Sequence, residues 1–61
     1  MPYINLKVAG KLTKEQKNEI VKEFTDTMER IAQKPKRATY IVIDEVNREN
    51  WAKEGQLLSE S

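Results

Sequence analysis

The chain has 61 residues with no Cys and no His, and its 11 Lys+Arg against 10 Asp+Glu leave a net charge of +1. These counts exclude a disulfide framework and a zinc site built from the usual sulfur and nitrogen ligands. Charges of both signs are mixed along the sequence, so there is no basic stripe that would fit a nucleic-acid backbone. No apolar run approaches the roughly 20 residues of a membrane span. We therefore expect a soluble, cytoplasmic protein with no nucleic-acid, membrane or metal partner.

The short length itself predicts self-association. A chain of this size buries only about 60% of the surface that its unfolded form exposes. Small domains usually gain stability from disulfides, a structural metal or partner subunits. Because the first two are excluded, we expect a homo-oligomer.

The first predicted element is a strand over residues 3–8. Ile4, Leu6 and Val8 alternate with polar neighbours, and this period of two places the aliphatic side chains on one face. Gly10 ends the pattern. Pro2 leads the strand, where a residue without an N–H costs nothing, so a proline at this position needs no functional explanation by itself.

A helix is predicted from Thr13 to about Gln33. Thr13 and Gln16 have the spacing of a capping box, and Pro35 disfavours helical geometry at the residue before it. Apolar residues recur between these ends at helical spacing, which predicts one buried face. These residues are Ile20, Val21, Phe24, Met28, Ile31 and Ala32.

A second strand is predicted over residues 38–46, because its centre consists of β-forming residues. Two strands joined through a helix form a βαβ unit, parallel and right-handed. The run is apolar without alternation, so both of its faces should be covered. One helix covers only one face, and we expect neighbouring copies to cover the other and to extend the open sheet edges.

The remaining residues predict a short C-terminal hairpin or tail. Gly55 suits a tight turn, while Leu57 and Leu58 need a surface to bury against. Trp51 is the only tryptophan, and it can equally be the wall of a cleft or an anchor in a subunit interface. Asp44 and Glu45 are adjacent in a strand and point to opposite faces, so we interpret them as strand-end charges rather than a paired acid/base site.

The order of these features resembles the 4-oxalocrotonate tautomerase family. The resemblance is carried by Pro2 leading a strand, Glu15-Gln16-Lys17 opening a Thr-capped helix, a strand ending Ile43-Asp44-Glu45-Val46, and Asn50-Trp51 before a glycine. It implies that residues 1–61 form a single tautomerase-like domain of the α/β (α+β) class, a single βαβ unit with a short C-terminal hairpin. It also implies dimers with a four-stranded sheet and two helices, and a hexamer of three dimers.

The resemblance also implies a reaction. Met1 is removed, and the nitrogen of Pro2 becomes the general base that moves a proton between enol and keto forms of small 2-oxo or 2-hydroxy-dienoic acids, with no cofactor. The chemistry of the amine agrees, because an α-amino group has a pKa of about 8 against about 10.4 for a lysine. Apolar surroundings or nearby cations lower it further, to where it is a usable base near neutral pH.

The substrate-binding residues are less clearly indicated. Family members that act on dicarboxylates carry arginines at two positions that are Leu12 and Tyr40 in this sequence. Lys11 follows Gly10 and restores a positive charge, but a lysine lacks the bidentate fork of arginine. The candidates for binding substrate are Trp51, Lys11, Tyr40, Arg37 and Arg48. Each also has an ordinary role as a packed aromatic or a solvated cation, so the reaction type is better indicated than the substrate.

Two alternatives stay open at this point. A protonated Pro2 can act as an acid in hydration or dehalogenation of an unsaturated acid, which a pH profile distinguishes from a base. Alternatively, the chain retains Met1 and forms a non-catalytic oligomer. The intact mass of the natively processed protein shows whether Met1 is retained, and so separates this alternative from the tautomerase and from the hydratase or dehalogenase.

Overall fold

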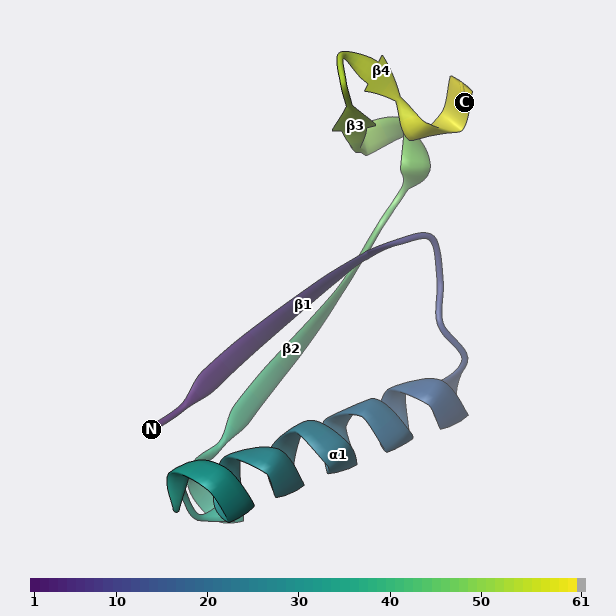
Figure 1. Cartoon of the computed structure of the whole chain (residues 1–61). Coiled ribbons are helices and arrows are strands. Elements are labelled where there is room, and N and C mark those ends of the chain that lie inside the picture. Colours follow the sequence, from purple (N-terminus) through teal and green to yellow (C-terminus); the bar gives the residue numbers. More distant parts are fainter. Residues whose placement is uncertain (61) are drawn as a thin grey trace.

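A computed structural model describes residues 1–60 of the protein. Its elements in chain order are β1 (Tyr3–Ala9), α1 (Lys14–Ala32), β2 (Tyr40–Val46), β3 (Ala52–Lys53) and β4 (Gln56–Leu57), with 3-10 turns at Lys36–Ala38, Arg48–Asn50 and Leu58–Glu60. Figure 1 shows a βαβ unit followed by a small hairpin. The predicted α+β architecture is confirmed.

The two long strands form a parallel pair whose register runs from Tyr3 opposite Tyr40 to Ala9 opposite Val46. Backbone hydrogen bonds continue the pairing beyond both ends. The Tyr40 N–H donates to the Pro2 carbonyl at 3.0 Å, and the Gly10 N–H donates to the Val46 carbonyl at 2.9 Å. Parallel strands require a long crossover, which α1 provides.

The start of β2 differs from the sequence prediction. We expected a strand from residue 38, but Lys36–Ala38 forms a 3-10 turn and the strand begins at Tyr40. The Ala38 N–H donates to the Pro35 carbonyl at 3.0 Å, so this amide is used locally and does not join the sheet.

The helix begins and ends where the sequence predicts. The Gln16 N–H donates to Thr13 Oγ1 at 3.1 Å, and the Thr13 N–H donates to Gln16 Oε1 at 2.9 Å, which completes the capping box. At the other end Gln33 takes the left-handed conformation, with φ of 55°, and its N–H donates to the Glu29 carbonyl at 3.2 Å. Within residues 1–60 no helix combines the length and apolar character needed to cross a bilayer.

The sheet is covered on one face only. α1 lies along one face, where the aliphatic side chains of the strands are half-buried (Figure 1). On the open face Tyr3, Tyr40 and Val42 remain 59%, 56% and 42% exposed. The cover expected on both faces of β2 is therefore not supplied within a single chain.

A single chain also has no closed core. None of residues 1–60 is fully buried. The radius of gyration is 14.5 Å, whereas a compact domain of this length has about 10.5 Å. The accessible surface of 4918 Å² is about a fifth larger than that of a compact protein of this mass. These dimensions are typical of a protomer that completes its packing against other subunits.

The hairpin extends the molecule beyond the end of β2 (Figure 1). Glu54 and Gly55 have φ of 55° and 78° between β3 and β4, and positive φ at both central residues is the signature of a type I′ hairpin turn. The Leu58 N–H donates to the Trp51 carbonyl at 2.9 Å and closes the base of the hairpin.

We predict that Thr13→Ala lowers the free energy of unfolding by about 1 kcal/mol, because the Gln16 amide loses its side-chain acceptor. Urea unfolding followed by circular dichroism measures this change. Lys14→Ala, at the exposed first position of the helix, should alter stability by less than about 0.5 kcal/mol. Equal losses in the two variants would contradict the role of the cap.

Candidate functional site

Three of the predicted site residues gather at the N-terminal end of the sheet. Because β1 and β2 are parallel, both strands begin at this end. Pro2 is half-buried and its carbonyl accepts the Tyr40 N–H at 3.0 Å. Arg37 lies in the 3-10 turn that leads into β2. Pro2, Tyr40 and Arg37 therefore lie in one neighbourhood of a single chain.

The other three lie at the opposite end. Lys11 follows the end of β1, while Arg48 and Trp51 follow the end of β2. A strand of this length spans roughly 20 Å. Figure 1 shows the N-terminus and the C-terminal hairpin at opposite ends of the molecule, whose longest extent is 42 Å. A single chain does not bring Pro2 together with these residues.

Trp51 lines a hollow of about 430 Å³ at the C-terminal end of the sheet. Its lining residues are Lys7, Val46, Asn50, Trp51 and Ala52. The hollow combines an aromatic wall with one amide and one cation, groups that can contact an apolar body and a polar edge of a small molecule. Sequence analysis missed Lys7 and Asn50, although the alternation of β1 already placed Lys7 on the face away from the aliphatic residues.

The charge of Lys7 is balanced by Asp44. Lys7 Nζ donates to Asp44 Oδ2 at 2.7 Å, and Asn5 Nδ2 donates to the same oxygen at 3.0 Å. The hydrogen bond to Asp44 raises the pKa of Lys7, and the hydrogen bonds from Lys7 and then Asn5 lower the pKa of Asp44. Asp44 thus bonds to residues of the open face, while Glu45 bonds to the turn after β1 and to α1. The prediction that these carboxylates diverge is confirmed.

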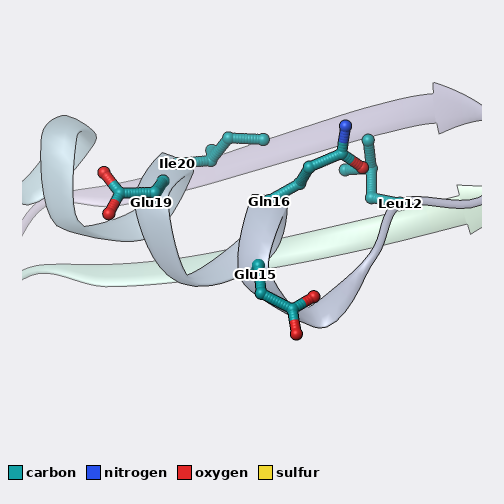
Figure 2. A pocket seen from close by; sticks show the side chains of 5 residues that line it. All are labelled: Leu12, Glu15, Gln16, Glu19 and Ile20. Carbon is teal, nitrogen blue, oxygen red and sulfur yellow. The ribbon is translucent and has the colours of Figure 1, made fainter.

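Two further hollows follow the helix and contain none of the six predicted site residues. The first, of about 450 Å³, is lined by Leu12, Glu15, Gln16, Glu19 and Ile20. Figure 2 shows the carboxylate of Glu15 pointing away from the side chain of Leu12. The second, of about 290 Å³, is lined by Ile4, Phe24, Thr27 and Met28. Only the second of these hollows is lined by residues of both the sheet and the helix.

Comparison with known proteins identifies the family. The sequence model of the family described as Tautomerase enzyme matches residues 2–61, so the match begins at Pro2. This chain belongs to the tautomerase family. The resemblance predicted from the order of its sequence features is confirmed.

Individual tautomerases are similar to this chain over nearly its full length. A probable tautomerase of Helicobacter pylori is 34% identical over 59 residues, which cover 92% of this chain and 87% of the relative. The solved structure of DmpI from Helicobacter pylori has a TM-score of 0.89 at 29% identity, covering 97% of this chain and 92% of that one. YwhB, described as a homologue of 4-oxalocrotonate tautomerase, has a TM-score of 0.93 at 25% identity and 98% coverage of both chains. The fold and the family support an isomerase-type enzyme.

We predict that Asp44→Asn makes the free energy of unfolding depend less on pH below about pH 5. The pKa of Asp44 lies below its ordinary value of 3.8, so its contribution to stability is complete above that value and is lost as the pH falls through the lowered pKa. Between about pH 5 and pH 2 the wild-type protein should therefore lose stability more steeply than the variant. Urea unfolding midpoints measure both slopes.

Glu23→Gln is the matched control, since it removes the same charge from an exposed position on the helix. Glu23→Gln should lose stability with falling pH as steeply as the wild-type protein does. If Asp44→Asn also kept that slope, the hydrogen bonds to Asp44 would not contribute to folding.

Proposed function

We propose that this protein is a cofactor-independent tautomerase of the 4-oxalocrotonate tautomerase type. Removal of Met1 frees the amine of Pro2, which acts as general base on small 2-oxo or 2-hydroxy-dienoic acids. The observation that carries this proposal is the position of Pro2. It leads β1 at the edge of the sheet, and it is the first residue that the family sequence model matches.

The proposed reaction moves one proton and changes no oxidation state. The neutral amine takes the proton of an enol hydroxyl, and the carbonyl bond then forms as the electron pair of the enolate moves to a carbon of the substrate, which takes a proton from the protonated amine. The amine ends the cycle neutral. A secondary amine suits this task because its pKa begins near neutrality, and any apolar cover supplied by another subunit lowers it further.

The geometry of a single chain supports an active site shared between copies. Pro2 and the hollow around Trp51 lie at opposite ends of the sheet, so a second copy has to bring its Trp51 to the first copy's Pro2. The open face and the lack of any fully buried residue within residues 1–60 also favour association. We propose a homohexamer of three dimers, and a protein of the same fold from Chloroflexus aurantiacus is described as a heterohexamer.

The shared site also divides the proposed substrate-binding residues. Arg37 and Tyr40 come from the chain that supplies Pro2, whereas Lys11, Arg48 and Trp51 come from another copy. The cations can bind a substrate carboxylate, and the hydroxyl of Tyr40 can donate to a substrate oxygen. The single domain over residues 1–61 and the cytoplasmic location stay predictions of the sequence.

We predict that Pro2→Ala loses about a hundredfold in kcat/KM for enol-to-keto conversion, because a primary amine on a freely rotating bond replaces the secondary amine that the proline ring holds in place, and a well-placed acid/base group contributes about that factor. The wild-type activity should rise with pH through the pKa of the Pro2 amine, because only the neutral amine is a base. The intact mass of the purified enzyme should show that Met1 is absent. Unchanged activity in Pro2→Ala would refute the proposal, and activity that falls with rising pH would favour an acid role as in a hydratase.

We predict that two inactive variants complement each other when mixed. Pro2→Ala and Trp51→Ala, unfolded together and refolded, should recover about a quarter of the wild-type activity per site, since random assembly pairs an intact Pro2 with an intact Trp51 in that fraction of shared sites. Each variant refolded alone is the control. A site contained within one chain would give no recovery, because every chain in the mixture carries a defect.

A further inference from the structure

We propose that Glu45 is a positioning residue that holds the turn after β1, and through it Lys11, against the end of β2. The inference rests on the proposed function, in which Lys11 binds a substrate carboxylate at a shared site. It assigns a role to a residue outside the predicted site set.

Glu45 bonds to this turn with one carboxylate oxygen and to α1 with the other. Oε2 accepts the Leu12 N–H at 2.7 Å, and Oε1 accepts Lys17 Nζ at 2.9 Å. The side chain of Glu45 is 24% exposed, whereas that of the neighbouring Asp44 is 41% exposed. The less exposed of the two carboxylates is therefore the one that accepts a hydrogen bond from the turn.

A backbone hydrogen bond fastens the turn on the other side of Lys11. Gly10 has a φ of 94°, which favours glycine, and its N–H donates to the Val46 carbonyl at 2.9 Å. Lys11 thus lies between two amides, those of Gly10 and Leu12, that are both bonded to the last residues of β2. These bonds determine where the backbone of Lys11 lies.

The ion pair of Glu45 with Lys17 does not involve the ammonium group of Lys11. Lys17 neutralises Glu45, and the hydrogen bond from Leu12 together with Lys17 lowers the pKa of Glu45, so the carboxylate stays ionised at neutral pH. Lys11 is exposed and takes part in no ion pair within residues 1–60. The charge of Lys11 also helps to lower the pKa of Glu45, but its ammonium group is not held in an ion pair by any of the described residues and can meet a substrate carboxylate near that position.

The backbone anchor matters because lysine is flexible. A lysine presents a point charge on a four-carbon stem and has no rigid fork to fix its geometry. If the turn were loose, the ammonium group would sample a wider arc and bind the carboxylate less well. Loss of the anchor should therefore raise KM about tenfold, the size of one hydrogen bond, with little change in kcat.

Two variants of Glu45 separate the effect of its side-chain length from the effect of its charge. Glu45→Gln keeps an acceptor for the Leu12 N–H but loses the charge, whereas Glu45→Asp keeps the charge but is shorter by about 1.5 Å. We expect Glu45→Asp to raise KM for a 2-hydroxy-dienoic acid and Glu45→Gln to stay within about twofold of wild type. Glu23→Asp, at an exposed position on α1, is the matched control and should keep the wild-type KM.

A double variant tests whether Glu45 acts through Lys11. Lys11→Ala should raise KM, and adding Glu45→Asp to it should raise KM no further, since a missing ammonium group cannot be misplaced. Amide hydrogen exchange at Leu12 should quicken in Glu45→Asp and stay slow in Glu45→Gln. Additive effects on KM, or slow exchange in Glu45→Asp, would overturn the positioning role.

These outcomes are distinct from failure of the proposed function. A wild-type protein without tautomerase activity would overturn the proposed function and the role of Glu45 with it. An active enzyme whose KM is unchanged in Glu45→Asp would overturn the role of Glu45 alone.

Discussion

Parallel pairing of β1 with β2 is the constraint on which the rest of this structure depends. Parallel strands must be joined by a crossover, and the helix that makes it can cover only one face of a two-stranded sheet. Both strands also begin at the same end, so Pro2 lies beside Tyr40 while Trp51 lies beyond the far end of the sheet. Fold, open face and divided site follow from this one pairing.

Assembly and catalysis are therefore linked in the proposed enzyme. The open face leaves Tyr3, Tyr40 and Val42 exposed, and their burial against other copies would supply stability that a chain of 61 residues lacks alone. In the proposed assembly, a neighbouring copy also brings its hollow around Trp51 to Pro2. A subunit that stays alone would have neither a closed core nor a complete site.

Charge pairing within the protomer separates structural cations from available ones. Lys7 pairs with Asp44, Lys17 with Glu45 and Lys36 with Asp26, at 2.7, 2.9 and 3.1 Å. Within residues 1–60 the other cations take part in no ion pair, and Lys11, Arg37 and Arg48, the cations proposed for a substrate carboxylate, are among them. A site that uses them would bind its substrate without first breaking an internal ion pair.

The sequence by itself determined the elements, because periodicity, the capping box and Pro35 are local signals: β1 and α1 end where these signals predict. It also determined the family and singled out Pro2. The start of β2 was placed two residues early because the Pro35 carbonyl takes the Ala38 amide into a turn. Only the tertiary structure decided that Pro2 and Trp51 lie at opposite ends, that Lys7 shares a hollow with Trp51, and that Glu45 grips the Leu12 amide from 33 residues away. Those contacts depend on the strand register and on the path of the chain between the elements, which the periodicity of one segment does not specify.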